Sequence, residues 1–302
     1  MNAPKSTSSL AVSALVINAL VWGVSWWPFR EMQSHGLHPL WSTTLIYVLA
    51  TVCVLAWKPE SWRLLVQHRG LLLLMLAAGL TNVGFNWAVT IGDVVRVVLL
   101  FYLMPAWSVL IAWALLDEKP TTASLLRLLL ALAGVLIVLK SPTSPWPVPN
   151  SLADWLALAG GLFFALTNVL LRKHGNTASE SRMLAMFGGG ALMATAAAFL
   201  GMGAGIVPAP TFALAGVPVA IGLCIAFMVS NLLLQYGAAR LVASTTALVM
   251  LTEILFASVS SAWLGAAEFS IRTLIGGGLI VLAALLAALA PAVAEPEASR
   301  LS

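Results

Sequence analysis

The chain has very few charged residues. Of its 302 residues, 9% are Asp, Glu, Lys or Arg and 61% are hydrophobic, whereas about 25% of the residues in an ordinary soluble domain are charged. A soluble domain of this length would have to expose more polar surface, while a chain in a lipid bilayer can present apolar side chains on every side. The composition therefore excludes a soluble globular protein and indicates an integral membrane protein.

Cysteine and histidine are also scarce. The two cysteines, Cys53 and Cys224, lie inside apolar runs, so neither a disulfide framework nor a thiolate metal site is expected. The four histidines lie in or beside predicted loops and do not share the spacing of metal ligands. The basic residues form no patch interleaved with aromatic side chains, which argues against nucleic acid as a partner. We therefore expect no metal and no cofactor.

The sequence contains ten apolar segments, each near the roughly 20 residues that a helix needs to cross a hydrocarbon core of about 30 Å. They lie at about 9–29, 39–57, 70–91, 95–116, 121–139, 151–171, 183–205, 213–236, 242–264 and 270–290. The first segment is long for a signal peptide and has no small-residue cleavage site, so we expect a retained helix. The predicted fold class is an all-α integral membrane protein with ten transmembrane helices.

The distribution of basic residues predicts the orientation. If the N-terminus is cytoplasmic, eleven Lys and Arg residues lie on the inner side and four on the outer side, namely Arg30, Arg96, Lys140 and Arg272. Lys and Arg resist translocation across the membrane. We therefore expect both termini in the cytoplasm, as short tails at 1–8 and 292–302.

An internal duplication is indicated by the Pro-rich stretch at 141–150, which divides the segments five and five. "VWGVSWWPFR" lies over "FFALTNVLLR" at an offset of 142, and an offset of 149 pairs Asn82 with Asn231 and Asn86 with Gln235. Because each half has an odd number of spans, the half at 151–291 enters the membrane inverted relative to the half at 9–140. Inverted repeats of this kind are typical of secondary transporters, which bind their substrates near the midplane between the repeats.

These features resemble a known family. The first-segment "WG", the spacing of Pro105, Trp113, Asp117 and Glu118, and the following "AGVLIVL" are similar to the drug/metabolite transporter superfamily, EamA type. Within it, "GDVVRVVLLFYLMPAWS" is similar to the aromatic amino-acid exporter branch. The resemblance implies a bacterial inner-membrane exporter in which helices one to four and six to nine surround a central cavity, with helices five and ten at the periphery.

Glu253 lies near the centre of the ninth segment, where an acid is costly and by default marks function. It could exchange a proton during transport, receive a substrate ammonium group, or form a hydrogen bond with a neighbouring helix. All three alternatives stay open. Glu253 is followed by Ile254, where the family commonly has a proline, so the sequence does not indicate a kink in the ninth helix.

Amides and aromatic residues within the spans predict a binding cavity. Asn82 and Asn86 are four residues apart and share one helix face, and Asn231 and Gln235 hold the matching places in the second half. Such amides join helices or line a wet cavity, and aromatic side chains beside them suit a large apolar ligand with polar groups, although aromatics also serve as ordinary packing. The predicted substrate-binding residues are Asn82, Asn86, Trp87, Phe101, Tyr102, Phe163, Phe164, Asn168, Asn231, Gln235 and Tyr236.

Four residues are candidates for a gate or hinge. Asp93 and Arg96 are three residues apart, so their side chains can pair on a helix. They could form a gate, or they could be a helix-start acid and an arginine that extends to the interface. Pro28 and Pro105 lie within spans, where a proline removes a backbone hydrogen bond and kinks the helix. Pro105 could be a hinge or a static packing kink, and Pro28 is a candidate hinge.

The sequence therefore predicts a secondary carrier that exports aromatic and other large neutral amino acids, and related small metabolites, by alternating access. The alternative is a proton-coupled exporter of drugs and other cations with the same fold. An enzyme is not expected, because no clustered nucleophile, metal site or acid pair is visible. The expected partners are a small-molecule substrate and membrane lipid, and a homodimer is left open.

Overall fold

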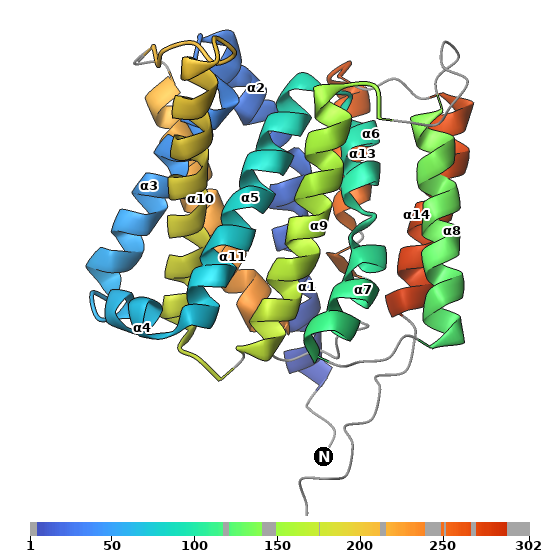
Figure 1. The fold of residues 1–302 in the computed structure, drawn as a ribbon, viewed down its shortest axis with the longest axis horizontal. Coiled ribbons are helices and arrows are strands. Elements are labelled where there is room, and N and C mark those ends of the chain that lie inside the picture. Colours follow the sequence, from blue (N-terminus) through green and yellow to red (C-terminus); the bar gives the residue numbers. More distant parts are fainter. Residues whose placement is uncertain are drawn as a thin grey trace, which may run out of the picture.

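The computed structural model describes residues 5–116, 121–140, 149–174, 176–211, 216–238, 249–250, 252–266 and 270–288. Within these residues the regular elements are helices, most of which run side by side (Figure 1). Their bounds are α1 (Lys5–Val24), α2 (Trp26–Ser34), α3 (Pro39–Trp57), α4 (Ser61–Gln67), α5 (Arg69–Ile91), α6 (Val94–Phe101), α7 (Met104–Leu116), α8 (Thr122–Leu139), α9 (Leu152–Lys173), α10 (Ser179–Gly203), α11 (Gly216–Ala238), α13 (Thr252–Trp263) and α14 (Ile271–Ala288). Most of the predicted linker and tails, the family-motif residues Asp117 and Glu118, and the start of the ninth predicted segment lie outside the described residues.

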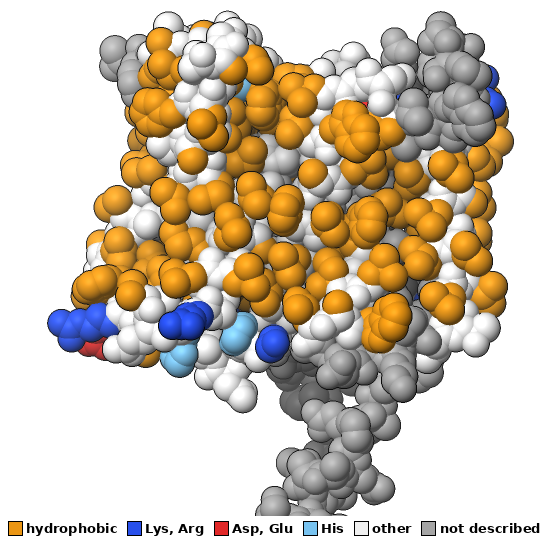
Figure 2. Space-filling view, viewed as in Figure 1, with side chains coloured by type: hydrophobic (Ala, Val, Ile, Leu, Met, Phe, Trp, Pro, Cys, Tyr) orange, Lys and Arg blue, Asp and Glu red, His pale blue; other side chains and the backbone are white. Residues whose placement is uncertain are grey.

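Six stretches are helical, long and apolar enough to cross a membrane: Ser9–Ser34, Pro39–Trp57, Arg69–Ile91, Leu152–Leu171, Ser179–Gly203 and Gly216–Gly237. Hydrophobic side chains cover the face of the molecule in Figure 2, and Leu200 and Trp263 are 76% and 87% exposed. An apolar surface of this extent suits lipid and not water. The protein is therefore a multi-pass membrane protein, as the composition predicts. The other four predicted spans are not among these six stretches of the described residues, so the count of ten stays a prediction.

Two predicted spans are broken, and each break lies just ahead of a proline. α1 ends at Val24, and Pro28 is the third residue of α2; α6 ends at Phe101, and Pro105 is the second residue of α7. Proline has no N–H to donate to the carbonyl four residues earlier, and its ring clashes with that carbonyl. Those carbonyls belong to Val24 and Phe101, so each helix ends at the residue whose acceptor loses its helical donor.

The central helices pack closely. α5 contacts α9 and α10, α1 contacts α11 and α13, and α3 contacts α10 and α11. α8 and α14 contact each other at one edge of the bundle, where the family resemblance puts helices five and ten (Figure 1). The approach of α5 to α9 requires a glycine, because a Cβ added at Gly84 would lie 2.8 Å from the Leu156 carbonyl oxygen and 3.0 Å from the Gly160 Cα.

The two ends of the bundle differ in charge. We call one the basic end, where α3 ends, α4 and the start of α5 follow, and α9 ends; its basic residues include Lys58, Arg63, Arg69 and Lys173. Lys and Arg side chains lie along the lower edge of Figure 2, and α1 begins at the same end (Figure 1). We call the other the Asp93 end; it holds Arg30, Asp93, Arg96 and Asp154. In the predicted topology, the basic end is cytoplasmic.

Candidate functional site

A cavity lies between helices of both predicted halves. The described lining residues are Asn18, Trp22, Tyr47, Ala78, Thr81, Asn82, Phe85, Phe101, Phe164, Thr167, Met186, Phe187, Phe227, Asn231, Leu234, Met250 and Glu253. The cavity is therefore mainly apolar, with a few polar groups.

Five aromatic rings form a continuous wall of the cavity. The Trp22 ring stacks on Phe227 at a centroid distance of 4.5 Å and meets Phe85 edge to face at 6.3 Å. Phe85 lies 4.7 Å from Phe101, which stacks on Phe164 at 5.3 Å. These rings come from α1, α11, α5, α6 and α9, so the wall joins the two predicted halves. Such a wall offers flat apolar faces to an aromatic or large apolar ligand group.

Glu253 supplies the one carboxylate among the described lining residues, and no Lys, Arg or His is among them. Its side chain is buried, and its Oε2 accepts a hydrogen bond of 2.8 Å from the Tyr102 hydroxyl. The same hydroxyl lies 3.2 Å from the Met250 carbonyl oxygen. Tyr102 follows the end of α6, so the helix break ahead of Pro105 brings this hydroxyl to the acid. The arrangement leaves Glu253 able to meet a positively charged group in the cavity.

The amides of the cavity are held by neighbouring helices. Asn82 accepts a hydrogen bond from the Tyr47 hydroxyl and donates to the Ala78 carbonyl oxygen. Asn18 donates to the Ser230 hydroxyl at 2.6 Å and to its carbonyl oxygen at 2.9 Å. These contacts fix the amides, and the unused oxygen of Asn18 is buried without a partner. It is available to a ligand donor.

Five of the twelve predicted substrate and coupling residues line this cavity: Asn82, Phe101, Phe164, Asn231 and Glu253. Tyr102 is not among the described lining residues, but its hydroxyl donates a hydrogen bond to the lining residue Glu253. Gln235 donates to the Asn231 side chain at 2.8 Å and contacts Ser179, so it supports a lining residue.

The remaining predicted residues are not among the lining. Asn86 is buried and donates to the Thr43 hydroxyl at 3.3 Å, and the Asn168 amide lies 3.4 Å from the Met104 sulfur. Trp87 lies edge to face against His38, and partial burial lowers the pKa of that imidazole below its ordinary value. Phe163 and Tyr236 are partly buried and also lie outside the lining. A role in binding for these five residues stays a prediction.

The sequence analysis missed several lining residues, chiefly Asn18, Trp22, Tyr47, Phe85 and Phe227. A signal was present for the first two. Asn18 is a polar residue inside an apolar span, and Trp22 follows four residues later on the same helix face. No comparable signal marks Phe85 or Phe227, because an aromatic residue in an apolar helix has the same sequence pattern in a cavity wall and in ordinary packing.

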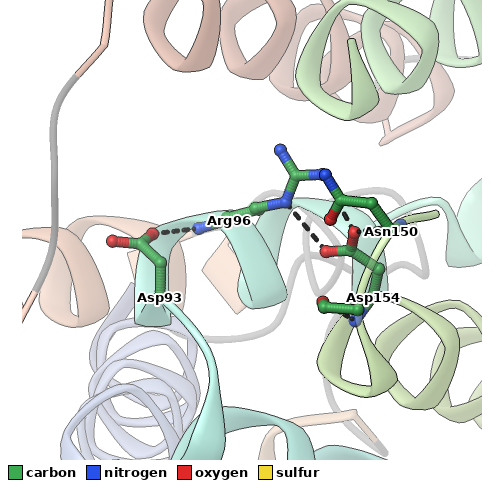
Figure 3. A network of polar contacts seen from close by, with 5 residues as sticks. Asp93, Arg96, Asn150 and Asp154 are labelled. Carbon is green, nitrogen blue, oxygen red and sulfur yellow. Dashed lines mark hydrogen bonds and ion pairs between the residues drawn. The ribbon is translucent and has the colours of Figure 1, made fainter. Parts of the chain in front are cut away.

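The predicted gate residues lie at the Asp93 end, apart from the cavity. Asp93 is the N-cap of α6, and its carboxylate accepts a hydrogen bond from the backbone N of Arg96 at 2.8 Å. The helix-start interpretation of this acid is thus confirmed. The Arg96 guanidinium forms an ion pair with Asp154 of α9, which the sequence analysis did not single out (Figure 3).

Comparisons with known proteins agree with this fold. No curated protein matches the chain. A solved structure titled "Crystal structure of protein" is 19% identical, with a TM-score of 0.60, over 92% of this chain and 96% of that chain. Residues 9–140 match the family model described as "EamA-like transporter family". The chain is thus a multi-pass membrane protein whose first 140 residues contain a match to the EamA-like transporter family, on a fold that a solved structure shares over most of its length.

Proposed function

We propose that this protein is a secondary transporter of the drug/metabolite transporter superfamily that moves small amphipathic molecules by alternating access. The observation that carries the proposal is the cavity itself. It lies inside a bundle of membrane helices, five aromatic rings form its wall, and Glu253 supplies one carboxylate. An enzyme would need reacting groups in reach of each other, and this proposal requires only binding and release.

Two inverted repeats, at 9–140 and 151–291, are supported by the pattern of helix contacts. Exchange of the predicted equivalents pairs α1 with α9, α3 with α10, α5 with α11, and α7 with α13. Under this exchange the contact of α5 with α9 becomes that of α11 with α1, and the contact of α5 with α10 becomes that of α11 with α3. The contact of α7 with α9 becomes that of α13 with α1. Two equivalent halves can rock to expose a central site to each side in turn.

The cavity lining supports the same repeats. Trp22 and Phe164 are equivalent at the sequence offset of 142, and Asn82 and Asn231 at the offset of 149. All four line the cavity. The proposed ten-helix arrangement therefore has its binding site at the pseudo-symmetry axis, where inverted repeats meet.

For the substrate we propose aromatic and other large neutral amino acids, exported across the bacterial inner membrane. The aromatic wall suits the side chain, Glu253 suits the ammonium group, and the cavity amides are left to meet the carboxylate. A second candidate is a lipophilic cation. It is favoured by one observation, which is that the described lining contains a carboxylate and no basic side chain to pair with a substrate carboxylate.

The test is saturable uptake of labelled phenylalanine into proteoliposomes that contain the purified protein. Phe164 lines the cavity and its neighbour Phe163 does not, so the two alanine variants form a matched pair. We expect Phe164→Ala to lose most of the flux and Phe163→Ala to retain it. Uptake of a lipophilic cation without uptake of phenylalanine would select the second candidate, and loss of flux in neither variant would exclude this cavity as the site.

A further inference from the structure

The two predicted halves are joined at the Asp93 end by an ion pair between a partly buried arginine and a buried aspartate. The Nε of Arg96, on α6, lies 2.8 Å from Oδ1 of Asp154, on α9, and its Nη2 lies 2.9 Å from Oδ2 (Figure 3). This is the bidentate arrangement in which an arginine holds a carboxylate most strongly. The pair therefore ties α6 of the first half to α9 of the second.

Further hydrogen bonds hold each partner of the ion pair in place. The Asp154 side chain is 1% exposed, and its Oδ2 also accepts a hydrogen bond from the backbone N of Asn150 at 3.1 Å. The Ser151 hydroxyl accepts a hydrogen bond from the Asp154 backbone N, which resembles the capping box of a helix start. Asp93 fixes the backbone of Arg96 by capping α6. The Arg96 side chain remains 24% exposed, so water reaches part of it.

The ion pair lies at the Asp93 end, nearer to that end of α6 and of α9 than the cavity residues on the same helices. Arg96 precedes the cavity residue Phe101 by five residues on α6, a rise of roughly 7.5 Å along a helix, and Asp154 precedes Phe164 on α9. Between the level of the ion pair and the level of the cavity, α9 packs tightly against α5 and α6. Gly161 lies against the Phe101 carbonyl, and a Cβ added at Gly160 would lie 3.2 Å from the Phe85 backbone N. α6 and α9 are therefore in close contact between the level of the ion pair and the level of the cavity.

An ion pair that is partly removed from water can break and reform at little net cost in free energy. Removing two charges from water costs about as much as their attraction returns, so such a pair adds little to the net stability of the fold. Its effect depends instead on hydration. With α6 and α9 packed, each charge has the other as its partner; once water enters between the helices, both are solvated and the tie is lost.

We propose that Arg96 and Asp154 form a latch that holds the cavity closed toward the Asp93 end and that separates when the protein opens to that side. The latch rests on the proposed alternating access, and in the predicted topology it is the outer gate. It is distinct from the binding residues, because neither partner lines the cavity.

The test measures access to the cavity from each side of the membrane. The reporter is Ala78→Cys, in a chain with Cys53→Ser and Cys224→Ser, because Ala78 lines the cavity on α5. A membrane-impermeant maleimide is added to one side of proteoliposomes without substrate. Separate reporters, Glu31→Cys at the Asp93 end and Arg63→Cys at the basic end, identify which end faces the reagent.

We expect Arg96→Ala and Asp154→Asn each to raise the rate of labelling from the Asp93 end on the order of tenfold, because loss of one partner disfavours the closed arrangement. The charge exchange, Arg96→Asp with Asp154→Arg, should return the rate toward that of the parent. It also answers the objection that a single variant merely misfolds. Glu31→Gln is the matched control, since it neutralises an exposed acid at the same end, and should change nothing.

Unchanged labelling in both single variants would overturn the latch, and so would equal increases from both ends, which indicate general loosening of the bundle. Phenylalanine uptake is measured in the same preparations. If the parent takes up phenylalanine but the Arg96 and Asp154 variants are labelled at the rate of the parent, only the latch is rejected. A response in labelling without phenylalanine uptake retains the latch and rejects the proposed substrate.

Discussion

Replacement of Glu253 by glutamine tests whether the negative charge of this side chain binds a substrate amine, because the shape of the cavity stays nearly the same. Glutamine has nearly the same size, and its oxygen can still accept the hydrogen bond from the Tyr102 hydroxyl, which measures 2.8 Å in the parent. The substitution removes only the negative charge. A hydrogen bond to a charged group contributes about 1.5–3 kcal/mol, and each 1.4 kcal/mol corresponds to a factor of about ten in affinity. We therefore expect Glu253→Gln to weaken binding of a substrate amine by roughly 10- to 100-fold.

The assay is equilibrium binding of labelled phenylalanine to purified protein in lipid nanodiscs, with two unlabelled competitors. Phenylethylamine has the amine without the carboxylate, and phenylpropionate has the carboxylate without the amine. In the parent, phenylethylamine should compete more strongly than phenylpropionate. Glu253→Gln should reduce the affinity for phenylalanine and phenylethylamine by similar factors, because the lost interaction is the same.

Two controls sharpen this prediction. Glu31→Gln neutralises an exposed acid that is not among the described lining residues and should bind as the parent does. Tyr102→Phe removes one neutral donor from Glu253, so a smaller loss of about 2- to 10-fold is expected, corresponding to about 0.5–1.5 kcal/mol. Parent-like phenylalanine affinity in Glu253→Gln would refute the reasoning and reduce this acid to a hydrogen-bonding partner of Tyr102.

Two further predictions address the packing of the helices. Gly84→Ala should destabilise the protein by about 1–3 kcal/mol, because the new Cβ would lie 2.8 Å from the Leu156 carbonyl oxygen and α9 would have to move. The measurement is thermal unfolding in detergent; the control is Gly222→Ala, where a Cβ meets nothing within 4 Å, and equal melting of the two variants would contradict the close approach. Cys53 on α3 and Cys224 on α11 lie on helices that pack against each other and their thiols interact electrostatically, so copper phenanthroline should join them as a disulfide. With a protease site inserted in the linker at 141–148, the cleaved halves should stay together on a non-reducing gel and separate in Cys53→Ser; separation of the oxidised parent would argue against the packing of α3 on α11.

Much of the fold could be predicted from the sequence, because hydrophobic length is a strong and local signal. Six predicted spans coincide with helices that can cross a membrane. The helix breaks followed from Pro28 and Pro105, since proline acts on a carbonyl only four residues away. The neighbours of each helix were not predictable in this way. They depend on close contacts such as Gly84 with Gly160, whereas a Cβ added at Gly216 or Gly222 would meet nothing within 4 Å, and the sequence does not distinguish the two kinds of glycine.

The site could be predicted only in part, for two physical reasons. Adjacent residues on a helix point about 100° apart, so Phe164 lines the cavity and Phe163 does not, and the composition of the segment cannot tell them apart. Residues that share a face also differ in depth. Asn82 and Asn86 are four residues apart on α5, yet Asn82 lines the cavity while Asn86 binds Thr43 at a deeper level of the packing.

The partner of the Arg96 side chain could not be predicted from the residues near it in the sequence. Spacing suggested Asp93, three residues away, but that acid is used as a helix cap, and the guanidinium turns to Asp154, which is 58 residues away in the sequence. Arg96, in the first turn of α6, has both Asp93 and Asp154 close to it. Only the placement of α9 beside α6 decides between them.

The short helix α6 connects the cavity to the Asp93 end. It contains both Arg96, which pairs with Asp154, and Phe101, which belongs to the aromatic wall. It is bounded by breaks on either side, at Gly92–Asp93 and at Tyr102–Leu103, so it can shift without bending a long helix. In lipid, apolar burial gives little net drive for one packing of helices over another, and the directional contacts between the halves decide which arrangement is favoured. A ligand that displaces Phe101 would therefore move Arg96 relative to Asp154, and occupancy of the cavity would reach the latch through a single rigid element.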